Sequence, residues 1–204
     1  MLTIKEISTT IERKLFLDRY NKLAKMSVPE SYIHECKVYG AYIEGELQGG
    51  FAFALGNDMA WPSVLPEAGS IFQTVPQRYC LEINLVWASG KLHDSYVAML
   101  RFWFAVVQRA ANFSNIDYIT YAVDIRRSYL VKLYRRLACG TLFRGEVPKY
   151  PGREAIVFYT TPMRCKLAKL LCFQEFLIRF NRTIKRQKYS FSQMIKEVTV
   201  RANI

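Results

Sequence analysis

Apolar residues change their spacing several times along the first half of the chain, and each change predicts a new element. Alternation over residues 2–7 predicts a strand, and apolar positions at helical spacing from Ile11 to Leu23 predict a helix. Runs rich in Val, Tyr and Phe at 37–44 and 51–55 predict a hairpin joined by the turn glycines of GELQGG. Residues 56–78 contain three prolines and predict a long loop, which often lines a site.

The second half continues the alternation of strands and helices. The nearly all-apolar run 79–88 predicts a central strand covered on both faces. Further elements follow from the same criteria: a helix at 93–112, a strand at 117–123, a helix at 125–138 capped by Asp124, and strands at 141–146 and 154–160. This order predicts a mixed α/β (α+β) domain over residues 1–162, followed by a basic amphipathic helical extension over 163–204.

Positive charge gathers in two segments of the second half. The chain has 29 Lys and Arg against 17 Asp and Glu, a net charge of +12. Residues 126–153 hold eight basic and one acidic side chain, and residues 163–204 hold ten and two. Such segments favour anionic partners, namely nucleotide phosphates, an acidic protein, nucleic acid or an anionic membrane surface. A solvated positive surface without a partner is the alternative.

Cysteine, histidine and hydropathy patterns indicate a cytoplasmic protein. Five cysteines without a Cys-x-x-Cys pair predict reduced thiols, and the start of the chain lacks the layout of a signal peptide. His34 and His93 are far apart in the sequence, so no metal site is expected. No uncharged apolar run is long enough to span a bilayer. The extension is compatible with docking on the domain, a homodimer contact or peripheral contact with a membrane.

Three stretches resemble the GNAT superfamily of acyl-CoA-dependent N-acyltransferases: YIEGELQGGFAFAL, CLEINLVWASGKLHDSYVAML and YITYAVDIRRSYLVKLYRRLACGTLFRGEV. The most specific part is Leu133–Tyr134 followed by Leu137. The resemblance covers roughly residues 1–162 and implies a GNAT-like mixed central sheet of six to seven strands flanked by helices. The chain departs from the family in three places. The pyrophosphate loop keeps a single glycine, and Arg127 stands where the family usually has Asn. The family's Leu-Gly-Phe is replaced by Leu-Ala-Cys-Gly at 137–140.

The resemblance also implies where a pantetheine thioester would bind. Asn84, Leu85 and Val86 match the fourth strand, where the pantetheine arm pairs with free backbone groups. The backbone N–H of Leu85 or Val86 would then point at the thioester oxygen.

The phosphates of the cofactor would lie at the start of the next helix, in the loop Gly90–Ser95. Lys91, His93 and Ser95 could compensate there for the missing glycines. For His93 the alternative is that it lies in the first helical turn without binding phosphate.

Two side chains are candidates for proton transfer. Tyr134 is the candidate general acid for the leaving thiolate, and its alternative is a place on the packed face of its helix. Glu82 is the candidate general base because it is the only carboxylate in an apolar strand. Its alternative is an ion pair with Arg78 or Lys91, in which case water would deprotonate the amine.

The helix that carries Tyr134 also carries a basic cluster: Arg126, Arg127, Lys132, Arg135 and Arg136. These cations suit the 3′-phosphate of coenzyme A, and they equally suit the acidic surface of an acyl carrier protein. GNAT-like N-acyl amino acid synthases and acyl-homoserine lactone synthases use long acyl chains, some of them carrier-borne.

We therefore expect an acyltransferase that moves an acyl group from acetyl-CoA, a longer acyl-CoA or an acyl carrier protein to an amine by direct attack. A non-catalytic GNAT-like module that binds nucleic acid or an acidic protein through its basic second half is the alternative.

Overall fold

The computed structural model describes residues 1–63, 75–147 and 152–168. By its internal contacts the chain divides into two compact units, Met1–Lys166 and Leu167–Ile204. The first unit contains every element discussed below. The predicted boundary after residue 162 lies at the start of a helical segment, 162–168, and the predicted extension beyond it lies almost entirely outside the described residues.

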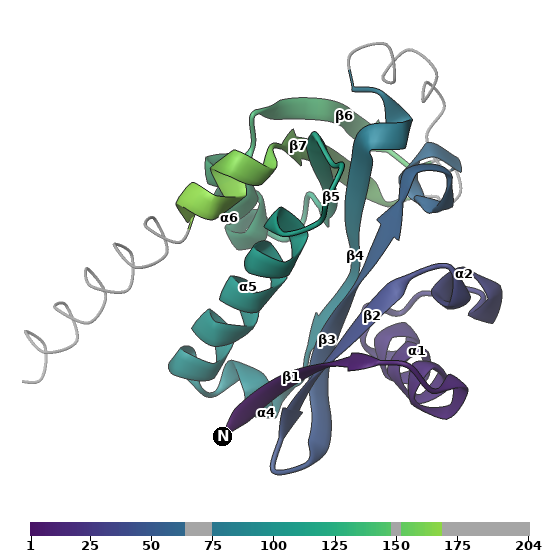
Figure 1. Ribbon diagram of the computed structural model, residues 1–204, viewed down its shortest axis with the longest axis vertical. Coiled ribbons are helices and arrows are strands. Elements are labelled where there is room, and N and C mark those ends of the chain that lie inside the picture. The colour runs from purple at the N-terminus through teal and green to yellow at the C-terminus, as the bar shows by residue number, and fades with distance from the viewer. Residues whose placement is uncertain (64–74, 148–151, 169–204) are drawn as a thin grey trace, which may run out of the picture. The chain divides into compact units, whose positions relative to one another are not determined.

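A mixed sheet of seven strands forms the centre of the described structure, in the order β1-β2-β3-β4-β5-β7-β6 (Figure 1). The pair β4–β5 is parallel and the other neighbouring pairs are antiparallel. The strands are β1 (Leu2–Ile7), β2 (Lys37–Ile43), β3 (Glu46–Leu55), β4 (Cys80–Ala88), β5 (Tyr118–Asp124), β6 (Gly140–Glu146) and β7 (Glu154–Thr160). The mixed sheet predicted from the sequence is confirmed.

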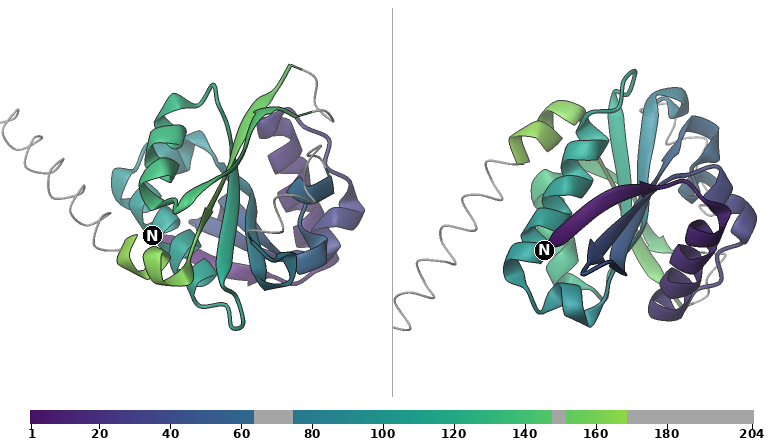
Figure 2. Two further views of the ribbon diagram at one scale, coloured as in Figure 1. Left: turned by 90° about the horizontal axis from the view of Figure 1, so that it is seen from above. Right: turned by 60° about the horizontal axis from the view of Figure 1, so that its bottom comes forward.

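Helices cover both faces of this sheet (Figure 2). One face carries α1 (Thr10–Ala24) and the short α2 (Glu30–His34), and the other carries α5 (Tyr96–Ala111) and α6 (Ser128–Leu137). The single-turn α4 (Gly90–His93) precedes α5, and the described loop residues include 3-10 turns at Gly56–Asp58, Trp61–Ser63 and Gln77–Tyr79. No helix among the described residues has the length and hydropathy that crossing a membrane would require.

Each face has its own hydrophobic core, because alternate residues of the central strands point to opposite sides. On the α1 and α2 side, Phe16 and Ile33 are fully buried against β-strand residues such as Trp87. On the α5 and α6 side, Phe51 and Phe102 are buried with Leu81 and their neighbours. The sheet therefore separates two cores that are built from different helices.

Local geometry corrects three boundaries. The hairpin turn is made by Glu44 and Gly45, whose φ angles of 54° and 81° are those of a two-residue turn. The strand β3 consequently begins at Glu46, earlier than the predicted 51–55. The predicted helix at 93–112 is broken by Asp94 and Ser95 into α4 and α5.

Asp124 does not cap the next helix as predicted. Its Oδ1 accepts from the backbone N–H of Arg126 at 2.9 Å, and the helix begins later, after Arg127.

Gly50 is required by the close approach of β3 to both β2 and α1. A Cβ atom at this position would lie 2.3 Å from the backbone oxygen of Tyr39 and 2.5 Å from the ring of Phe16. The backbone oxygen cannot move without breaking the register of β2 and β3, so the space is closed to any side chain. Gly90 differs, since a Cβ there would meet nothing within 4 Å.

We expect Gly50→Ala to lower the free energy of unfolding by about 1–3 kcal/mol or more, the usual range for overpacking a well-packed interior. Gly90→Ala is the matched control and should leave it unchanged or slightly raised, because alanine restricts the unfolded chain. Urea unfolding of both variants measures the difference. Equal effects of the two substitutions would contradict the packing argument.

Candidate active site

The parallel strands β4 and β5 stay paired for only part of their length. Their register runs from Cys80 opposite Tyr118 to Ile83 opposite Tyr121, and it ends there. Beyond that point β4 continues to pair with β3, and β5 continues to pair with β7. Residues 84–88 of β4 and 122–124 of β5 therefore face each other without pairing. We call the place where the two strands part the fork. Such edges can pair with an extended ligand.

A bulge in β4 lies at the beginning of the fork. Leu85 has a φ of 48°, and the register between β3 and β4 shifts opposite this residue, between Gly50 and Ala52. Positive φ is uncommon for a leucine, and it turns the backbone away from the regular strand. The structure thus places Asn84, Leu85 and Val86 together where β4 leaves β5. Their contact with a pantetheine arm stays a prediction.

Glu82 lies beside the fork on the α1 and α2 face and is 4% exposed. Its Oε2 accepts a hydrogen bond of 2.5 Å from the backbone N–H of Ala60, in the loop that the sequence predicted to line a site. Burial raises the pKa of this carboxyl to about 7, and the bond from Ala60 acts in the opposite direction. A pKa in this range suits a general base, and the role of Glu82 as the base stays a prediction.

The alternative ion pair of Glu82 with Lys91 is not formed. Lys91 pairs with Glu44 at 2.9 Å and with Glu46 at 3.8 Å. Among the described ion pairs none includes Glu82.

Sequence reasoning missed the groups that surround Glu82, because no periodic pattern predicted an element between Leu23 and residue 37. The short helix α2 lies there, and Pro29 is the N-cap residue that directly precedes it. Tyr32 of α2 accepts a hydrogen bond from the side-chain amide of Asn84, and Cys36 donates to the backbone oxygen of Tyr32 at 3.3 Å. Burial raises the pKa of the Tyr32 phenol and raises that of the Cys36 thiol to about 12. Cys36 is therefore not a thiolate nucleophile.

Tyr134 lies on the opposite face of the sheet, at the same level as the fork. Its ring packs edge-on against Tyr121, the last β5 residue that pairs with β4, at 5.2 Å and against Trp103 at 5.8 Å. Burial raises the pKa of the Tyr134 phenol, and the nearby charge of Arg127 lowers it. The phenol thus stays protonated at neutral pH and can act as a proton donor. The ring thus packs against the core on the α5 and α6 side. The role of Tyr134 as general acid stays a prediction.

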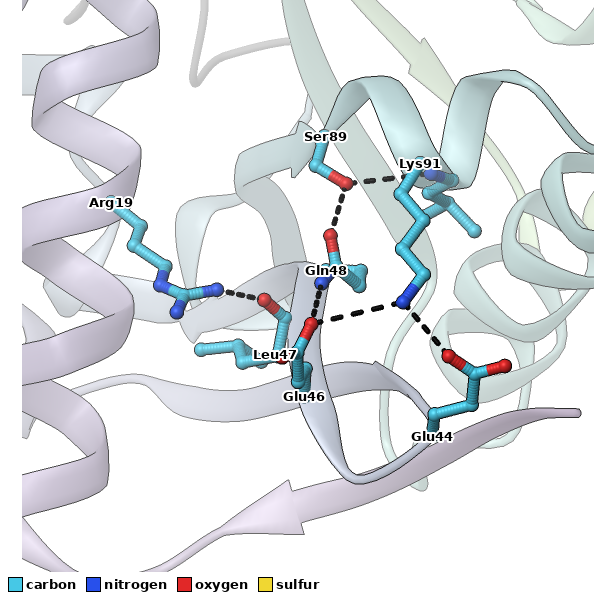
Figure 3. Close-up of polar contacts among 8 residues, drawn as sticks. Arg19, Glu44, Glu46, Leu47, Gln48, Ser89 and Lys91 are labelled. Atoms are coloured by element: carbon cyan, nitrogen blue, oxygen red, sulfur yellow. Dashed lines mark hydrogen bonds and ion pairs between the residues drawn. The ribbon is translucent and has the colours of Figure 1, made fainter.

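The predicted phosphate-binding loop is held by contacts within the protein (Figure 3). The hydroxyl of Ser89 donates to the side-chain oxygen of Gln48 at 2.6 Å and accepts from the N–H of Leu92 at 3.4 Å. Lys91 reaches across to Glu44 and Glu46 of the β2–β3 hairpin. Gly90 is exposed and begins α4.

The remaining candidates of this loop also occupy ordinary helical positions. Ser95 caps α5 by accepting from the N–H of Ala98 at 3.2 Å. His93 is exposed at the end of α4. Their binding of phosphate stays a prediction.

The basic cluster is exposed along α6. Arg126 is bound by the carboxylate of Asp124 at 2.5 Å, while Lys132 and Arg135 are exposed on the helix itself. The cations of residues 169–204, on which the nucleic-acid alternative partly depends, lie outside the described residues. No group of three His, Cys, Asp or Glu within the described ranges is arranged to hold a metal ion.

The fold is similar to that of solved N-acyltransferase structures. The N-acyl amino acid synthase FeeM from uncultured soil microbes superposes with a TM-score of 0.63 at 11% identity, covering 81% of this chain and 93% of that chain. Arabidopsis thaliana NAA60 in complex with acetyl-CoA gives 0.56 at 10% identity, covering 79% and 98%. A GNAT family acetyltransferase from Elizabethkingia anophelis with acetyl-CoA bound gives 0.51 at 12% identity, covering 78% and 97%.

The two comparisons of sequence, by contrast, found no match. No protein-family model and no curated protein matches the chain. The structural likeness confirms the GNAT fold that the sequence resemblance implied.

The raised pKa of Glu82 makes stability depend on pH. Below pH 4.5 the carboxyl is protonated in both states. Between that value and about 7 the unfolded chain releases the proton while the folded chain retains it, so folding becomes less favourable as the pH rises. We expect the wild type to lose about 3 kcal/mol relative to Glu82→Gln across this window. Above pH 7 the difference should stay constant.

Urea unfolding below pH 4.5 and above pH 7 measures that change, with Glu44→Gln as the control. Lys91 lowers the pKa of Glu44, so this substitution should not reproduce the trend. A pH-independent difference between the wild type and Glu82→Gln would show that Glu82 is not buried in its acid form.

Proposed function

We propose that this chain is an N-acyltransferase that moves an acyl group from a pantetheine thioester directly to an amine. One observation carries the proposal: β4 and β5 part after Ile83 and Tyr121, with Glu82 beside the fork on one face and Tyr134 on the other. The named activities of FeeM and of the Elizabethkingia anophelis enzyme, which share the fold, support it.

The donor enters the fork in this proposal. Amide groups of the pantetheine arm pair with the free edge of residues 84–86, as an added strand would. The bulge at Leu85 redirects the backbone at this point, so that an N–H of Leu85 or Val86 faces the thioester oxygen. A fixed donor aimed at the developing oxyanion lowers the barrier more than a mobile water does.

The transfer then needs two proton movements. The amine nitrogen attacks the thioester carbon and loses one proton to Glu82, while the carbon–sulfur bond breaks. Tyr134 gives its proton to the leaving sulfur, so a neutral thiol and an amide are formed. Glu82 then returns its proton to Tyr134 through water, and both groups regain their starting states. No covalent enzyme intermediate is required, and the buried thiols of Cys36 and Cys80 take no part.

The proposal extends to a carrier-protein donor, in preference to coenzyme A. Lys91 and Ser95 would be the residues that hold a pyrophosphate. Lys91 instead forms an ion pair with Glu44, and Ser95 caps α5. The carboxylate of Asp94 directly precedes that cap and repels phosphate. A carrier-borne arm has one phosphate only, and the exposed cations Lys132 and Arg135 of α6 suit an acidic carrier surface.

Activity is tested by incubating the full chain with acetyl-CoA, octanoyl-CoA or octanoyl carrier protein and a mixture of amino acids and simple amines. We expect release of free thiol and formation of an amide, which mass spectrometry identifies. Tyr134→Phe should lower kcat about 100-fold, because the leaving thiolate loses its proton donor. Tyr129→Phe, on the same helix and 58% exposed, is the matched control and should retain activity. Absence of thiol release with every donor would refute the proposal.

A charge reversal tests the nature of the donor. Arg135→Glu should raise KM for octanoyl carrier protein about tenfold and leave KM for octanoyl-CoA unchanged, because the effect acts through the protein surface. Lys14→Glu makes the same change in charge on α1, on the other face of the sheet, and should affect neither. Steady-state kinetics at low salt measure these constants. A clear preference of the wild type for octanoyl-CoA would contradict the carrier-protein donor.

A further inference from the structure

Asn84 contains a buried polar atom that no neighbour satisfies. Its Oδ1 is buried and receives no hydrogen bond from the described residues, whereas its Nδ2 donates to the hydroxyl of Tyr32. Buried polar atoms are rarely left unpaired, because the loss of water is then uncompensated. Trp87 Nε1 is also unpaired, but its indole packs edge-on against Phe16 within the core. Asn84 differs because it keeps partial exposure and lies at the fork.

The surroundings of Asn84 favour one kind of ligand. Glu82, two residues earlier on the same strand, accepts a hydrogen bond from Ala60, and hydrogen bonds of Asn84, Trp61 and Tyr32 also lower the pKa of its carboxyl. The unpaired Oδ1 of Asn84 therefore lies beside a group that carries a negative charge when it is ionised. A carboxylate or phosphate would be repelled here. A cation with two N–H groups on one nitrogen satisfies both oxygens.

We infer that Asn84 binds the acceptor amine, which is a primary amine: Oδ1 of Asn84 accepts one N–H of the ammonium group while the carboxylate of Glu82 accepts another. This inference rests on the proposed function and names its acceptor class. The third N–H of the ammonium group points toward the fork and loses its proton to water before the attack, which leaves the nitrogen lone pair facing the thioester. The proton facing Glu82 moves to the carboxylate when the carbon–nitrogen bond forms. The N–H facing Asn84 stays on the nitrogen and is retained in the amide product.

Binding can be tested without any thioester. The side-chain amide signal of Asn84 in the ¹⁵N-labelled full chain is identified by its loss in Asn84→Leu. We expect ethylammonium chloride to shift this signal saturably and tetramethylammonium chloride to leave it unchanged, because the second cation has no N–H. Equal shifts with the two salts, or no shift with either, would overturn the inference.

A stability comparison separates this role from a structural one. Asn84→Leu keeps the volume and removes the unpaired carbonyl, so we expect the melting temperature to stay the same or to rise. Gln48→Met is the matched control, since both ends of its buried amide are bonded, to Ser89 and to Glu46. The control should lower the melting temperature by about 2–4 °C or more. A similar decrease in Asn84→Leu would show that Asn84 belongs to the fold and would overturn the inference.

Kinetics distinguish the failure of this inference from that of the proposed function. If the protein transfers acyl groups, Asn84→Leu should raise KM for ethylamine about 10- to 100-fold. KM for the thioester should change much less, because the pantetheine arm pairs with the backbone of residue 84 and not with its side chain. An unchanged KM for ethylamine would refute the role of Asn84 and leave the transferase intact. Ethylammonium binding at Asn84 without thiol release from any donor would refute the transferase and leave the binding site intact.

Discussion

The parallel pairing of β4 and β5 ends after four residue pairs, and the site depends on that interruption. Strand β4 has to remain bonded to β3 while it leaves β5, and the bulge at Leu85 accommodates both demands. The closed space around Gly50 belongs to the same constraint, because it holds β3 tightly against β2 and α1 at the residue next to the register shift. A regular β4 would pair with β5 along its whole length and leave no backbone groups for a ligand.

Glu82 is buried close to the point where β4 leaves β5, and its burial sets the electrostatics of the site. Removing a carboxylate from water without a cationic partner is unfavourable, so burial raises the pKa of Glu82 to about 7. The hydrogen bond from the N–H of Ala60 offsets part of this effect. The charges that sequence reasoning would have placed nearby are used elsewhere, since Lys91 fastens the β2–β3 hairpin to α4. Glu82 therefore has no ion-pair partner among the described residues.

The strands, the long helices and the mixed sheet could be predicted because they depend on periodic burial, which the sequence displays directly. The nearly all-apolar β4 is the clearest case, and Glu82 was identified within it as the exception. The neighbours of Glu82 could not be predicted in this way. Tyr32 lies in a five-residue helix too short for a periodic signal, and its contact with Asn84 joins residues 52 apart in the chain. Likewise, the pairing of Lys91 with Glu44 depends on where the hairpin turns, which a pattern locates only approximately.

The two hydrophobic cores separate the surroundings of the candidate site residues. The surroundings of Glu82 and Asn84 belong to the α1 and α2 side, and those of Tyr134 belong to the α5 and α6 side, with one layer of backbone between them. Substitutions on the two sides share few contacts, so their energetic effects should combine nearly independently. A substitution that loosens the packing beside Glu82 should therefore leave the ring contacts of Tyr134 unchanged, and the reverse holds as well.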